Sequence, residues 1–151
     1  MKKEEYRKIL SDAIAKEVES YTFYRGIEKR TADKIMKKIF GDLAKEEQGH
    51  RETLENFLTQ PVASLHFDEA RDYKISEILD APQLTVDMKP IEGITLAIKK
   101  EEQSRNMYRE LANLSTDSEQ KKLFENLANM EGEHKAKLED MFTGMAFPEV
   151  W

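Results

Sequence analysis

Apolar side chains recur at spacings of three or four residues through the first part of the chain. From position 5 to position 30 this spacing predicts an amphipathic helix. Capping side chains follow at 31–33, and the same period then predicts a second helix that stops at Gln60 and Pro61.

The pattern resumes at Pro90, which suits the first turn of a third helix. Residues 116–119 fit a capping box that opens a fourth helix, and Gly144 suits its end. Short turns predict two antiparallel hairpins, at about 5–59 and 90–143, and the irregular stretch at 60–89 predicts a long crossover.

Composition narrows the possible functions. A length of 151 residues suits one domain over 1–151, and the absence of cysteine excludes disulfides, thiolate metal sites and a thiol nucleophile. The chain shows no signal-like or membrane-spanning apolar run, which predicts a cytoplasmic protein with no membrane association. The net charge of -6 argues against nucleic-acid binding.

An internal repeat relates the two predicted hairpins. At a fixed offset of 84 residues, segment 11–58 aligns with 95–142 without a gap, and 17 of the 48 aligned pairs are identical. One Glu-x-x-His motif occurs at aligned positions in both halves. In the preceding predicted helix of each half, one glutamate also aligns with its counterpart in the other half. The residues so selected are Glu17, Glu47, His50, Glu101, Glu131 and His134.

Each of these six residues fills a gap in an apolar stripe, so we expect all six to point into the core. Buried ionised carboxylates cost several kcal/mol each unless they are neutralised. Two divalent ions would neutralise the four glutamates, and carboxylates with imidazoles suit iron or manganese. The alternative is a purely structural role as hydrogen-bonded core residues.

Three other features suggest further hypotheses. Tyr24 and Tyr108 lie two turns after Glu17 and Glu101, where their hydroxyls either bond to ligand carboxylates or simply pack in the core. His66 has no repeat partner and is interpreted as an exposed loop histidine. The apolar tail 145–151 suggests packing on the bundle or on a second subunit.

This constellation resembles the ferritin-like diiron-carboxylate superfamily. The helix phrases 13–17 and 43–50 look like the first two helices of its rubrerythrin-like branch, over about 5–143. The resemblance implies an all-α, ferritin-like antiparallel four-helix bundle with a long crossover between helices 2 and 3. It also implies two iron ions held by the six residues above, with manganese or a mixed pair as the alternative.

The resemblance further implies an oxidoreductase that reacts with peroxide or dioxygen. A non-enzymatic iron-binding or iron-storage protein is the alternative. Rubrerythrins also carry a cysteine-ligated rubredoxin domain, which this chain cannot form, so we expect an external electron-donor protein. They have a further glutamate one turn after the third-helix ligand, where this chain has Ser104. We expect a homodimer.

Overall fold

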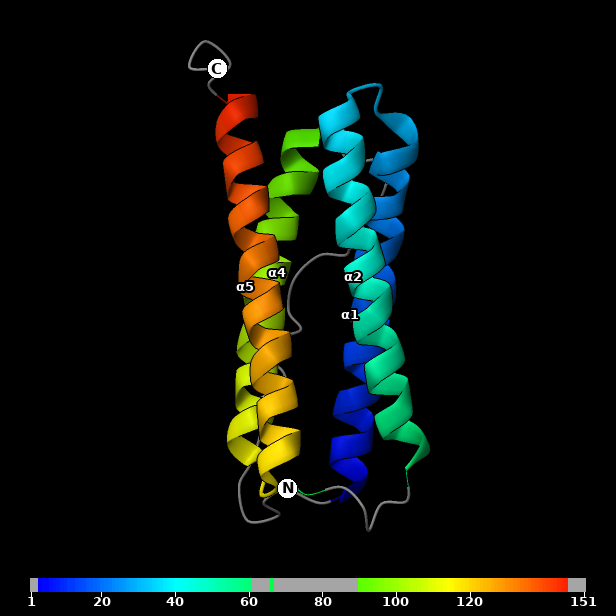
Figure 1. The fold of residues 1–151 in the computed structure, drawn as a ribbon, viewed down its shortest axis with the longest axis vertical. Coiled ribbons are helices and arrows are strands. Elements are labelled where there is room, and N and C mark those ends of the chain that lie inside the picture. Colours follow the sequence, from blue (N-terminus) through cyan, green and yellow to red (C-terminus); the bar gives the residue numbers. More distant parts are fainter. Residues whose placement is uncertain (1–2, 61–65, 67–89, 147–151) are drawn as a thin grey trace. The chain divides into compact units, whose positions relative to one another are not determined.

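The computed structural model describes residues 3–60, 66 and 90–146. The predicted crossover, apart from Gln60 and His66, and most of the apolar tail lie outside these residues. Four helices run in the order α1, α2, α4 and α5 through the described part (Figure 1). No helix among them has the length and apolar character needed to cross a membrane.

The first compact unit is a hairpin of α1 (Lys3–Arg30) and α2 (Lys34–Thr59). Asp33 caps α2, because its side chain accepts hydrogen bonds from the backbone N–H groups of Ile35 at 2.8 Å and Met36 at 3.1 Å. The three-residue turn predicted at 31–33 is therefore confirmed.

The far end of this hairpin is closed by an arginine from α1. The guanidinium of Arg7 donates to the backbone carbonyls of Leu58 at 3.1 Å and Gln60 at 2.7 Å. Leu58 lies in the last turn of α2, where no further helical N–H is available to its carbonyl, and Gln60 is the C-cap residue that follows the helix. The Gln60 N–H already donates to the Phe57 carbonyl at 3.2 Å, so Arg7 adds side-chain hydrogen bonds to the C-cap that α2 has.

The second compact unit is a hairpin of α4 (Pro90–Leu114) and α5 (Ser118–Ala146). Pro90 begins α4, as predicted. Gly144 does not end α5, because no described glycine has a positive φ and the helix continues to Ala146.

The cap of α5 is shifted by one residue from the predicted capping box. The helix begins at Ser118, and the backbone N–H of Gln120 donates to Asp117 Oδ2 at 2.9 Å, so Asp117 rather than Thr116 is the cap. The buried Gln120 side chain forms hydrogen bonds with the backbone of His66. Its amide donates to the His66 carbonyl at 2.9 Å, and its Oε1 accepts from the His66 N–H at 3.3 Å.

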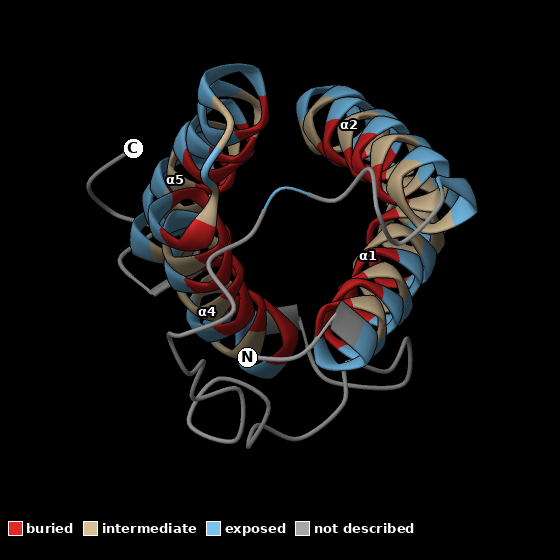
Figure 2. Ribbon diagram, turned by 90° about the horizontal axis from the view of Figure 1, so that it is seen from below, coloured by how far each residue is buried: buried red, intermediate tan, exposed pale blue. Residues whose placement is uncertain are grey.

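The buried residues follow one face of each helix, in agreement with the predicted stripes (Figure 2). The α1 stripe is wider than predicted, since Ile9 and Phe23 are also buried. The helical period also predicts Tyr21 on this stripe, but Tyr21 is only partly buried. Its ring lies 5.3 Å from the Arg25 guanidinium carbon. His66 is exposed, as expected.

Candidate metal centre

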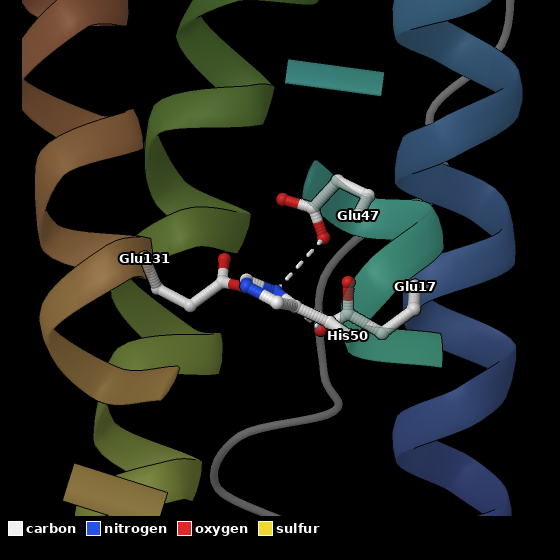
Figure 3. A group of neighbouring side chains, drawn as sticks. All are labelled: Glu17, Glu47, His50 and Glu131. Atoms are coloured by element: carbon white, nitrogen blue, oxygen red, sulfur yellow. Dashed lines mark ion pairs between the residues drawn. The ribbon is translucent and has the colours of Figure 1, made fainter. Parts of the chain in front are cut away.

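Three of the six predicted ligands come together in the first hairpin. Glu17 lies on α1, and Glu47 and His50 lie one turn apart on α2 (Figure 3). Nδ1 of His50 is 3.7 Å from Glu17 Oε1 and 3.8 Å from Glu47 Oε2. All three side chains are buried, with at most 3% of any residue exposed.

The second hairpin contains the matching set. Glu101 lies on α4, and Glu131 and His134 lie one turn apart on α5. Nδ1 of His134 is 3.5 Å from Glu101 Oε2 and 4.0 Å from Glu131 Oε2. These residues are at most 2% exposed. The helix period thus gives each hairpin the same triad of two carboxylates and one imidazole.

The geometry of each triad fits a metal ion. Within a triad, one ligand atom from each residue lies within 4.8 Å of the others. The histidine-to-carboxylate separations of 3.5–4.0 Å exceed a good hydrogen bond, and metal–ligand bonds of about 2.1 Å place two ligands of one ion about 3–4 Å apart. A cation would also neutralise the buried carboxylates. This donor set, without thiolate, suits iron.

Comparison with known proteins decides the family. The family model for rubrerythrin matches residues 8–142. The chain belongs to the rubrerythrin family. Among solved structures, this rubrerythrin-family chain is similar to a putative ferritin-like diiron-carboxylate protein of Thermotoga maritima, with 30% identity, a TM-score of 0.69, and coverage of 94% of this chain and 95% of the other.

A second similar structure is a hypothetical protein of Pyrococcus furiosus, with 23% identity, a TM-score of 0.73, and coverage of 93% of this chain and 89% of the other. No curated protein matches the chain. The predicted family and the predicted fold class, an all-α ferritin-like four-helix bundle, are thereby confirmed.

Both tyrosines predicted near the site are fully buried in this rubrerythrin-family chain. The ring of Tyr24 lies 5.9 Å from that of Phe40, and the ring of Tyr108 lies 6.4 Å from that of Phe124. Each pair joins the two helices of its own hairpin, so the aromatic packing repeats along with the triad. This contact supports a packing role, and it leaves the proposed hydroxyl role as a prediction.

A charged cluster that the sequence did not single out lies beside the second triad. Lys135 Nζ on α5 is 2.9 Å from Glu102 Oε2 on α4, and Arg105 Nη1 is 3.8 Å from the same oxygen. The hydrogen bond from Lys135 lowers the pKa of the Glu102 carboxyl, with a smaller contribution from Arg105, while burial opposes the shift. A Cβ added to Gly132 would lie 3.2 Å from Arg105 Cδ, so Gly132 leaves room for this arginine.

Proposed function

We propose that the chain is a diiron oxidoreductase that reacts with hydrogen peroxide or dioxygen. The observation that supports the proposal best is the pair of identical buried triads on a rubrerythrin-family chain. Glu17, Glu47 and His50 would hold one iron ion, and Glu101, Glu131 and His134 the other. Bound iron would supply the electrons that reduce the oxidant.

The protein's own residues prepare the ion for this chemistry. Each glutamate supplies an anionic oxygen ligand, and each histidine supplies Nδ1, the ring nitrogen nearest the carboxylates. The burial of all six side chains keeps bulk water from competing for the ligands and strengthens their electrostatic attraction to a cation. The apolar residues around the stripe therefore serve the site as well as the fold.

Tyr24 and Tyr108 belong to the proposal as residues that orient ligand carboxylates. A spacing of seven residues corresponds to about 10 Å along a helix, and helical side chains lean toward the N-terminus, which tilts each tyrosine toward the preceding glutamate. Tyr24→Phe should keep the ring contact with Phe40 and remove only the hydroxyl. An unchanged rate of iron oxidation in this variant would reduce the tyrosines to core residues.

The test starts with metal content. Protein prepared without air from iron-replete cells should contain about two iron or manganese ions per chain, because two triads offer two sites. Stopped-flow absorbance should then show oxidation of the diferrous protein by peroxide at least as fast as by dioxygen at equal concentration. Absence of metal, or a single zinc ion, would contradict the proposal.

If dioxygen oxidised the diferrous protein much faster than peroxide, the proposed activity would be that of a ferroxidase and not of a peroxidase. Ser104, which is buried one turn after Glu101, is the feature of the chain that favours this second candidate. A large multi-subunit shell in sedimentation analysis would indicate iron storage, whereas we propose a cytoplasmic homodimer. Because the chain has no cysteine to hold an iron–sulfur centre, we propose that electrons come from a separate protein.

A further inference from the structure

The two triads are alike, but the residues beside them differ. In the second hairpin, four neighbouring residues form a cluster that the first hairpin lacks. There Lys135 of α5 is joined to Glu102 of α4 at 2.9 Å, Arg105 lies 3.8 Å from the same carboxylate, and Gly132 leaves room for the arginine. Glu102 and Lys135 directly follow the triad residues Glu101 and His134 along their helices. The cross-helix ion pair therefore fixes the two helices where the triad spans them.

The repeat supplies an internal comparison, because none of the four residues recurs in the first hairpin. Its equivalents of Glu102, Arg105, Gly132 and Lys135 are Val18, Tyr21, Gln48 and Arg51. Val18 has no charge, so the equivalent ion pair cannot form. Arg51 contacts Glu55 within α2, with Nε 2.7 Å from Oε1, and Lys135 makes the equivalent approach to Glu139 at 4.0 Å, so the hairpins differ in the cross-helix pair.

We propose that Lys135 is a positioning residue that makes the Glu101, Glu131 and His134 triad the tighter of two metal sites. The inference rests on the proposed function, since it needs both triads to bind metal. Ligands that are already held in place lose less conformational freedom when an ion arrives, and groups that orient metal ligands commonly change metal affinity by about 10–100-fold. We therefore expect the second triad to fill first.

The direction of the effect separates positioning from simple electrostatics. Lys135 carries a positive charge, and removing a positive charge near a cation site should by itself strengthen cation binding. The positioning role requires the opposite result, a weaker site. A loss of affinity on replacing Lys135 is therefore an outcome that charge alone does not give.

The experiment is calorimetric titration of the metal-free full chain with Co(II) under argon, so that no redox reaction intervenes. Wild type should bind two Co(II) ions in two steps that differ by at least tenfold. Lys135→Met should weaken the tighter step about tenfold, and Lys135→Arg should restore it. Lys135→Gln, which also removes the positive charge, should act like Lys135→Met and serves if the latter fails to fold.

Arg51→Met is the matched control, because it removes the same charge at the equivalent place beside His50. It should leave the tighter step unchanged. His50→Ala should keep the tighter step and His134→Ala should lose it, which assigns the steps to the triads.

Equal affinities in wild type would overturn the inference, as would equal effects of Lys135→Met and Arg51→Met, or a tighter step that survives in His134→Ala. These outcomes leave the proposed function intact. Failure of wild type to bind Co(II), Fe(II) or Mn(II) at all would instead contradict the proposed function itself.

Discussion

Glu101→Leu tests the ligand assignment through stability alone. Glu101 is 2% exposed and lies on the α4 stripe that also carries Ala97 and Tyr108, so leucine fits the apolar character of the position. Its carboxylate shares the triad with that of Glu131. In the metal-free protein the substitution removes a buried ionisable group, whereas in the metal-bound protein it should remove a proposed ligand.

The expected magnitudes follow from these two effects. Replacement of buried charged groups by packed apolar residues is often neutral or stabilising by ~1–4 kcal/mol, and we expect the lower part of this range because His134 loses a neighbour 3.5 Å away. A change of 1 kcal/mol shifts the melting temperature of a chain this size by about 2–4 °C. Binding at 100 times the dissociation constant adds about 2.7 kcal/mol per site in wild type.

Thermal unfolding followed by circular dichroism, with and without Fe(II) under argon, measures both effects. Metal-free Glu101→Leu should melt at the same temperature as wild type or a few degrees higher, and it should lose much of the metal-induced rise. Glu133→Leu, at an exposed position next to His134, should keep that rise. A variant that is clearly less stable without metal and still gains as much from Fe(II) would show that Glu101 is not a ligand.

Three further predictions concern the hairpins. Gly49→Ala should raise the free energy of unfolding by up to about 1 kcal/mol, because a Cβ there meets no atom within 4 Å. Gly132→Ala should raise it less, because the added Cβ would crowd Arg105, and chemical denaturation of the two variants tests this difference. Asp33→Ala should cost about 1 kcal/mol through the lost cap of α2, measured in the same way, and no loss would contradict the cap. Gln120→Ala should speed amide exchange at His66, whereas an unchanged rate would argue against the side-chain bond.

Much of the fold could be predicted because helix period and breakers act locally. Pro90 was predicted to begin its helix, and the cap of α2 was predicted within 31–33, where Asp33 supplies it through a short side-chain bond. The prediction that Gly144 ends the last helix was wrong, because glycine permits a left-handed cap without requiring one. The roles of Arg7 and Gln120 depend on partners more than 50 residues away, which no local pattern reveals.

The triads could be predicted because the repeat separates inward glutamates from the many exposed ones. Glu46 and Glu47 are adjacent, but only Glu47 has a glutamate partner in the second half, and it is the buried one of the two. The alignment of the two halves did not single out Glu102 and Lys135, because it selects only residues that both halves share. A signal did exist in the mismatches: a glutamate aligned with Val18 and a glycine aligned with Gln48.

The Arg7 cap has a consequence for how the first hairpin folds. A three-residue turn closes one end of the hairpin, and the guanidinium fastens the other end to the carbonyls of Leu58 and Gln60. Closing so short a turn costs little chain entropy, so we expect α1 and α2 to meet early and the Arg7 bonds to form after both helices. The Arg7 hydrogen bonds should therefore slow unfolding of the hairpin more than they speed its folding.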